Sequence, residues 1–161
     1  NSRRLEKSFR LQGADLETEY TAIEAAIQRP LVKEADFHGK AAHLSHREED
    51  PCAILCTMTL DDLNVSGVPR YPVGISPIID PTSGEVPVDS KGRRSYTTGM
   101  SYCPSIKKFV VMGYLPKELA IQGKQLLIEY FNEDGDGVYP ATVQIVGKGS
   151  LYDPSNERVR A

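Results

Sequence analysis

The sequence predicts an α+β fold rich in β-structure, in which a short N-terminal helical and mixed segment precedes a small antiparallel barrel or sandwich of about six strands. After Pro51, β-branched and aromatic residues occur in short runs separated by Gly, Pro, Asp and Ser, a pattern typical of antiparallel strands. Before Pro51, apolar residues recur with helical spacing in two places. The 161 residues, 40% hydrophobic and 25% charged, suffice for one compact domain.

The first helix is predicted over residues 2–12. Leu5 and Phe9 stand four residues apart, which places them on one face of a helix. Ser2 is a suitable N-cap, and Gly13 is a suitable stop.

The second helix is predicted from Asp36, a suitable N-cap, through Arg47. Its small buried face would consist of Ala41, Ala42 and Leu44. Between the two helices, residues 14–32 show a mixed pattern, and Pro30 ends any helix that begins there.

Four later runs are predicted to be strands: residues 54–60, 109–114, 126–131 and 138–146. Turn-forming residues cluster at 80–84, 89–94 and 132–137. The last of these turns joins its two flanking runs into a hairpin. The regular spacing fits an antiparallel barrel and a sandwich alike.

Charge and cysteine content exclude several classes of protein. The 19 basic and 22 acidic residues give a net charge of -3, so no nucleic-acid partner and no membrane surface is expected. The apolar stretch 109–115 is far shorter than the roughly 20 residues of a spanning helix. The three cysteines, Cys52, Cys56 and Cys103, form neither a disulfide framework nor a metal motif, which favours a reducing compartment.

Two patterns suggest metal binding, and neither is convincing. Residues 132–137 match the first half of an EF-hand loop, but the twelfth position is Val143 rather than a bidentate carboxylate. His38, His43 and His46 lie close in sequence, yet only the last two have a helical ligand spacing, and no further ligand follows. A polar hairpin tip and a solvated helix face are the favoured interpretations.

Signatures of nucleophilic catalysis and of phosphate binding are absent from the sequence. There is no Gly-x-Ser-x-Gly elbow, no Gly-x-Gly-x-x-Gly and no Gly-Lys-Ser/Thr. Cys52 and Cys56 are expected to line strand faces. Arg93 and Arg94 could meet an anionic ligand tail, but a solvated loop is the commoner fate of such a pair.

Several segments resemble one family in the same order along the chain. They are Arg4-Leu-Glu-Lys-Ser-Phe-Arg-Leu-Gln-Gly13, residues 19–25, 36–41, 97–108 and 113–116, Tyr139-Pro-Ala141, and Tyr152-Asp-Pro-Ser-Asn-Glu-Arg158. Together they resemble the C-terminal part of the aminomethyltransferase family, which includes the glycine cleavage T-protein. In sequence, the segments most resemble the folate domains of dimethylglycine and sarcosine dehydrogenases.

The resemblance implies that residues 1–50 complete a folate-binding domain and that residues 51–161 form the family's C-terminal antiparallel β-barrel. It implies transfer of a one-carbon unit to tetrahydrofolate, within an aminomethyltransferase or a dimethylglycine/sarcosine dehydrogenase-like enzyme of one-carbon metabolism. The family's catalytic acid, most of the folate site and any FAD domain would lie upstream, so the chain alone is expected to be inactive. Its partners would be the remainder of its own polypeptide and a small-molecule one-carbon donor, in the cytoplasm or the mitochondrial matrix.

Four residues can be compared with the family's ligand contacts. Phe9 occupies a position where a ring can approach the pterin, unless it is simply the buried partner of Leu5. Glu6 either helps to orient the site, is a buried structural acid, or pairs with Arg10 along the helix. Glu157 stands where the T-protein places a ligand-contacting Tyr, and a carboxylate cannot stack. Arg158 could instead pair with the glutamate tail of folate.

Two departures from the family pattern support an alternative. The segment Thr21-Ala-Ile-Glu-Ala lacks the family's Pro, and residues 87–96 form a longer stretch than the family has before Thr97. These changes suggest a divergent member. The alternative is therefore a non-catalytic regulatory or interaction module of the same fold.

Overall fold

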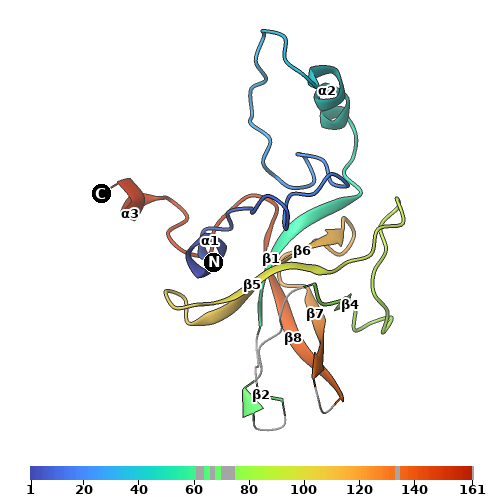
Figure 1. Cartoon of the computed structure of the whole chain (residues 1–161), viewed down its shortest axis with the longest axis vertical. Coiled ribbons are helices and arrows are strands. Elements are labelled where there is room, and N and C mark those ends of the chain that lie inside the picture. The colour runs from blue at the N-terminus through green and yellow to red at the C-terminus, as the bar shows by residue number, and fades with distance from the viewer. Residues whose placement is uncertain (61–63, 66–67, 70–74, 133–134, 161) are drawn as a thin grey trace.

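The computed structural model describes residues 1–60, 64–65, 68–69, 75–132 and 135–160. Its centre is a curled six-stranded antiparallel sheet with the strand order β4-β7-β8-β1-β6-β5 (Figure 1). The elements are α1 (Ser2–Glu6), α2 (Lys40–Glu48), β1 (Ala53–Leu60), β2 (Asn64–Val65), β3 (Val68–Pro69), β4 (Ile78–Ile79), β5 (Thr97–Cys103), β6 (Lys108–Pro116), β7 (Gln125–Asn132), β8 (Gly135–Val146) and α3 (Glu157–Arg160). The predicted fold class is confirmed.

Strand β1 separates two hydrophobic cores, because its alternate side chains point to opposite faces of the sheet. Cys56, Met58 and Leu60 join the core inside the curl of the sheet. Ala53 and Leu55 join a second core on the opposite face, where the N-terminal segment contributes Leu5 and Ala25. The strand is therefore buried on both faces, and the N-terminal segment is part of the same packed unit.

The two edges of the sheet meet through main-chain hydrogen bonds. The amide of Ile78 donates to the carbonyl of Ser95 (3.2 Å), and the amide of Thr97 donates to the carbonyl of Ser76 (2.9 Å). Gly113 lies beneath this seam, where an added Cβ would stand 2.7 Å from the carbonyl oxygen of Tyr96. The curled sheet is therefore joined between its β4 and β5 edges by a short seam of hydrogen bonds and not by a long strand pair.

The predicted turns are present where the structure describes them. The amide of Gly84 donates to the carbonyl of Asp80 (2.8 Å), and that of Gly92 to Asp89 (2.9 Å). Strands β7 and β8 pair from Gln125 to Asn132, which confirms the hairpin. Residues 133 and 134 of its turn lie outside the described residues.

Helix α1 is shorter than the predicted helix over residues 2–12, and its N-cap is Asn1 rather than Ser2. The helix stops at Glu6 because Ser8 adopts a positive φ of 52°. The Ser2 hydroxyl instead lies 2.9 Å from the Ser101 hydroxyl of β5. Docking onto β5 therefore overrides the local helical pattern.

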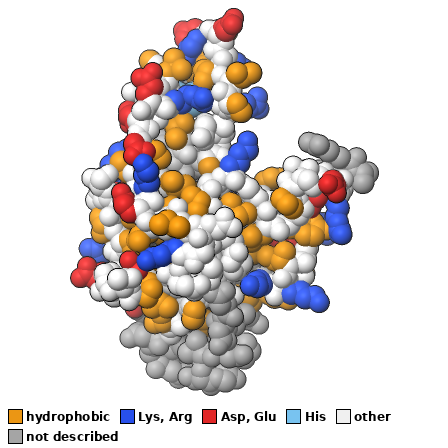
Figure 2. Space-filling model, turned by 180° about the vertical axis from the view of Figure 1, so that it is seen from behind, with side chains coloured by type: hydrophobic (Ala, Val, Ile, Leu, Met, Phe, Trp, Pro, Cys, Tyr) orange, Lys and Arg blue, Asp and Glu red, His pale blue; other side chains and the backbone are white. Residues whose placement is uncertain are grey.

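Helix α2 begins after Gly39, whose φ is 81°, so the prediction of Asp36 as its N-cap is wrong. The predicted buried face is wrong, because Ala41, Ala42 and Leu44 are all exposed. The helix belongs to a segment that projects away from the sheet (Figure 1). From behind, this projection shows hydrophobic and charged side chains intermingled (Figure 2). Leu31, on the same projection, is 87% exposed.

Candidate functional site

A cavity of about 480 Å³ lies where the turn after α1 meets the C-terminal segment. We call it the Phe9 cavity. Its lining comprises Lys7, Ser8, Phe9, Arg10, Leu16, Ala26, Ile27, Lys148, Gly149, Ser150, Pro154 and Asn156. Three basic side chains and one aromatic ring thus share the lining with apolar, small and polar residues, and no carboxylate occurs among these described lining residues.

Phe9 is presented to this cavity and is not packed into the core. Its side chain is 61% exposed, whereas Leu5 is completely buried, so the interpretation of Phe9 as Leu5's buried helical partner is wrong. The reason is the early end of α1, after which Ser8 reverses the chain with a positive φ. The carbonyl of Phe9 then accepts a 3.0 Å hydrogen bond from Arg4 Nη1. An exposed ring on a fixed backbone can stack on a flat ligand.

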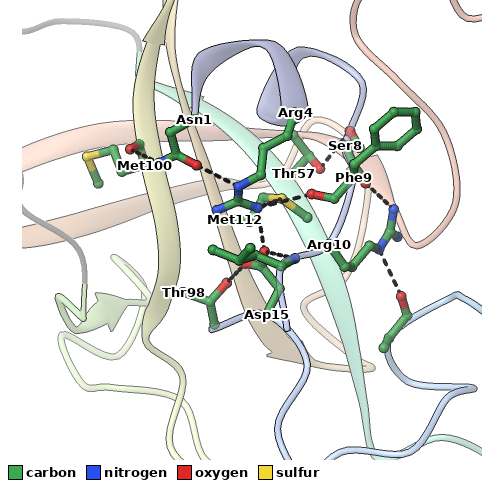
Figure 3. Close-up of polar contacts among 12 residues, drawn as sticks. Asn1, Arg4, Ser8, Phe9, Arg10, Asp15, Thr57, Thr98, Met100 and Met112 are labelled. Carbon is green, nitrogen blue, oxygen red and sulfur yellow. Dashed lines mark hydrogen bonds and ion pairs between the residues drawn. The ribbon is translucent and has the colours of Figure 1, made fainter. Parts of the chain in front are cut away.

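Arg4 and Asp15 form the buried ion pair that fixes this turn (Figure 3). Asp15 Oδ2 accepts hydrogen bonds from Arg4 Nη1 (2.5 Å) and the Leu11 amide (2.8 Å), and Oδ1 accepts one from the Thr98 hydroxyl (2.5 Å). An added Cβ at Gly99 would stand 2.6 Å from Arg4 Nη2. The pair thus ties the backbone around Phe9 to strand β5.

Glu6 is a buried, hydrogen-bonded acid. Its carboxylate accepts hydrogen bonds from the Ser105 amide (2.8 Å) and the Ser105 hydroxyl (3.0 Å). Its backbone carbonyl accepts from the amides of Leu151 and Tyr152. This arrangement matches the structural interpretation of Glu6, and its role in orienting a ligand stays a prediction.

Arg10 lies beside the cavity and does not make the predicted helical pair with Glu6. Its guanidinium donates to the carbonyl oxygens of Ser8, Ala25 (3.0 Å) and Gly147 (2.6 Å). Burial lowers the pKa of Arg10, while the charges of Tyr114 and Asp15 act in the opposite direction. Its charge is held by carbonyl dipoles from three segments, so Arg10 fixes the cavity wall and also makes it electropositive.

The C-terminal segment is held against this wall by Lys7. Lys7 Nζ donates to the carbonyl of Asp153 (2.6 Å) and to Asn156 Oδ1 (2.7 Å). Asp153 and Asn156 both have positive φ values, of 47° and 61°. The segment therefore bends sharply here and returns to the N-terminal turn.

Glu157 and Arg158 lie on α3, just beyond this bend, and both are exposed. The guanidinium of Arg158 donates to the Tyr152 hydroxyl (2.7 Å) and lies 5.5 Å from the centre of its ring. The structure places the two residues next to cavity residues Pro154 and Asn156 in the chain, although neither lines the cavity itself. Their contact with a ligand stays a prediction.

Arg93 was expected in a solvated loop, and this expectation is wrong. Its side chain is 11% exposed and lies between the carboxylates of Glu24 and Asp89, with Nη2 at 2.5 Å and 2.7 Å from them. The same expectation holds for Arg94, whose side chain is exposed. The spacing of Thr21 and Glu24 is a capping-box pattern, Thr-x-x-Glu, which marks Glu24 as a structural acid but does not identify Arg93 as its partner.

In the part of the chain that the structure describes, the remaining motifs do not form a site; residues 133 and 134 of the EF-hand-like motif lie outside that part. No group of three or more His, Cys, Asp or Glu side chains among the described residues could hold a metal ion. Cys56 and Cys103 are buried, and burial raises their pKa to about 12 and about 11. Cys56 lies in β1 as expected, whereas the expectation is wrong for Cys52, which directly precedes that strand.

Comparisons with known proteins identify relatives of the chain. No protein-family profile matches the chain. Mitochondrial dimethylglycine dehydrogenase from Rattus norvegicus is 30% identical over 165 residues, and an aminomethyltransferase from Francisella philomiragia is 29% identical over 134 residues. The chain is a homologue of dimethylglycine dehydrogenase and of aminomethyltransferase. This confirms the resemblance found in the sequence.

The same fold occurs in a solved structure. The glycine cleavage system aminomethyltransferase T from Bartonella henselae superposes with a TM-score of 0.67 at 23% sequence identity, covering 89% of this chain and 36% of that one. The matches to the rat and Francisella proteins cover 99% and 78% of the 161-residue chain. It spans only 17% and 33% of the lengths of those relatives. In the described part of the chain, no helix is both long and apolar enough to cross a membrane.

Proposed function

We propose that this chain supplies part of the folate site of an enzyme that transfers a one-carbon unit from an aminomethyl or N-methyl donor to tetrahydrofolate. The observation that carries the proposal is the exposed ring of Phe9, fixed at its backbone, on a cavity of about 480 Å³. This volume falls in the range of small-molecule sites, roughly 300–1,000 Å³. The names of the relatives suggest an aminomethyl group or dimethylglycine as the one-carbon donor, and the family resemblance of the sequence suggests tetrahydrofolate as the acceptor.

The cavity residues fit a folate by their chemistry. A flat pterin can stack on the Phe9 ring, and the glutamate tail carries carboxylates that Arg10, Lys7 and Lys148 attract. Tetrahydrofolate, when bound, supplies the amine nitrogen that accepts the one-carbon unit. The residues of this chain would bind and orient the cofactor and shield it from water.

The described lining of the cavity contains no carboxylate and no histidine to move a proton during such a transfer. We therefore propose that the catalytic acid comes from another part of a longer polypeptide, which would also bind the one-carbon donor and, in a dehydrogenase, FAD. A location in the mitochondrial matrix or the cytoplasm is compatible with this chemistry.

Calorimetric titration with folinic acid tests the proposal. We expect binding by the 161-residue protein, and a Phe9→Ala variant should lose about 1 kcal/mol of binding energy, or roughly fivefold in affinity. Because Phe9 is exposed, the stability should stay within about 0.5 kcal/mol. The matched control is Tyr102→Ala, which removes an exposed ring on β5.

Lys148 provides an electrostatic arm of the same experiment, because it is exposed and lines the cavity. A Lys148→Met variant should weaken the affinity for folinic acid, and the difference from wild type should shrink at high salt. No turnover of dimethylglycine is expected from this chain alone. Absence of folinic acid binding under saturating conditions would favour the non-catalytic interaction module, and turnover by the isolated chain would contradict the proposal that the acid lies elsewhere.

A further inference from the structure

The loop between β4 and β5 is tied to the N-terminal segment by the side chain of Arg93. Its Nη2 lies 2.5 Å from Glu24 Oε1, its Nε donates to Asp89 Oδ2 (2.7 Å), and its Nη1 donates to the carbonyl of Glu19 (2.5 Å). The guanidinium also lies 4.3 Å from the centre of the Tyr20 ring. One planar cation thus binds two carboxylates, a carbonyl and an aromatic face, a set of contacts that a lysine cannot reproduce.

Glu24 connects this cluster to the backbone of the cavity wall. Its Oε2 accepts a hydrogen bond from the Thr21 amide (2.8 Å), and its own amide donates to the Thr21 hydroxyl (3.2 Å). Its carbonyl accepts from the Leu55 amide of β1 (2.9 Å). The next carbonyl, that of Ala25, accepts from Arg10 Nε (3.0 Å). Two further residues, Ala26 and Ile27, line the Phe9 cavity directly.

The two carboxylates of the cluster share one cation among the described residues. The side chains of Glu24 and Asp89 are each only 2% exposed and share Arg93 as their ion-pair partner. Burial raises the pKa of Glu24, but the hydrogen bonds from Arg93 and Thr21 outweigh it and lower the pKa overall. Without Arg93, two buried carboxylates would face each other, and the segment bearing Glu24 would have to move to admit water.

We infer that Arg93 is a positioning residue for the Phe9 cavity: through Glu24 it sets the backbone of residues 24–27, and thereby the wall that Arg10 and Ala26 complete. Arg93 is not among the residues that line the cavity, so it acts through Glu24 rather than on a ligand. The consequence for folate affinity rests on the proposed function. The consequence for the wall itself does not.

Amide hydrogen exchange and folinic acid titration of the 161-residue protein test this inference together. In Arg93→Met we expect exchange of the amides of residues 25–27 to rise about tenfold, with exchange in the centre of β6 unchanged. Affinity for folinic acid should fall about tenfold, because the wall must be ordered before the ligand binds. Arg93→Lys keeps one ion pair and should recover part of both losses, and it serves as the second variant if Arg93→Met does not fold.

Two controls separate positioning from general destabilisation. Arg94→Met removes the exposed neighbouring charge and should change neither readout. Val143→Ala truncates a side chain in the core inside the curl, and should lower the melting temperature without a selective rise in exchange at residues 25–27. An increase in amide exchange in Arg93→Met that is uniform over the whole sheet would overturn the inference. Unchanged exchange at residues 25–27 would overturn it as well. If wild type itself does not bind folinic acid, the proposed function fails, while the exchange data still decide the role of Arg93.

Discussion

The buried carboxylate of Asp15 allows the sharpest prediction, because an asparagine there keeps the shape and removes only the charge. The side chain is fully buried and accepts hydrogen bonds from Arg4, the Leu11 amide and the Thr98 hydroxyl. In Asp15→Asn, the side-chain amide oxygen can still accept hydrogen bonds from Arg4 and from the Leu11 amide. The amide nitrogen can donate to the Thr98 hydroxyl, which can turn to accept. The loss is therefore almost purely electrostatic.

The size of the effect follows from the burial of both partners. Removing one member of a buried ion pair costs about 3–5 kcal/mol, since the other charge is left uncompensated. The Arg4 side chain is 16% exposed, and Asn keeps the hydrogen-bond acceptor, so we expect the lower end, about 3 kcal/mol. For a chain of this size, the melting temperature should fall by roughly 6–12 °C.

Urea unfolding followed by far-ultraviolet circular dichroism measures this cost, with an unchanged m-value as the sign of an intact native state. Glu17→Gln removes an exposed charge nearby and is the matched control. The double variant Arg4→Met/Asp15→Leu should recover part of the stability, because it leaves no charge unpaired. A cost below about 1 kcal/mol for Asp15→Asn, as for an exposed pair, would refute the reasoning.

Three further predictions concern other parts of the molecule. Lys7→Met should release the C-terminal segment at Asp153, raising amide exchange at residues 151–156 and lowering stability by about 1–2 kcal/mol in urea unfolding. Gly113→Ala should destabilise by about 3 kcal/mol or more, because its Cβ would collide with the Tyr96 carbonyl, whose backbone cannot yield easily. Glu24 has a pKa below its ordinary value of 4.5, so its stabilising contribution is present above that pH and is lost as the pH falls through the folded-state pKa.

Each of these predictions has a clear contrary result. Unchanged exchange in Lys7→Met would show that the backbone bend alone holds the C-terminal segment. Gly39→Ala, at a site with positive φ and open space, should cost only about 1 kcal/mol, and an equal cost at Gly113 would contradict the collision. In a Glu24→Gln variant, unfolding curves between pH 3 and 6 should show a weaker pH dependence than those of wild type, and identical slopes would be contrary to the assignment.

The sheet could be predicted from sequence because its strands carry local signals. Alternation at 54–60 and the turn-forming residues at 132–137 specify β1 and the β7–β8 pair without knowledge of the rest. Local signals fail where a distant partner decides the conformation. The 2–12 pattern looks helical, but contacts such as Ser2 with Ser101 and Glu6 with Ser105 settle where the helix stops.

The candidate site was only partly accessible from sequence for the same reason. Phe9 and Glu6 could be singled out by resemblance, but exposure distinguishes them, and exposure depends on the positive φ at Ser8. Arg93 could not be assigned, since its partner Glu24 is 69 residues away in the chain. Single-sequence patterns contain little information on such pairs of distant charges.

The long sequence separations around the Phe9 cavity have a consequence for folding. Arg10 and Gly147 are 137 residues apart, so at about 5–20 residues per second Gly147 is synthesised roughly 7–27 s after Arg10. The pairs β5–β6 and β7–β8 join strands that follow one another directly in the chain and can form as soon as they emerge. Within these 161 residues, the N-terminal segment is thus made before the sheet and placed after it. We expect an intermediate in which the sheet is complete and the cavity does not yet exist.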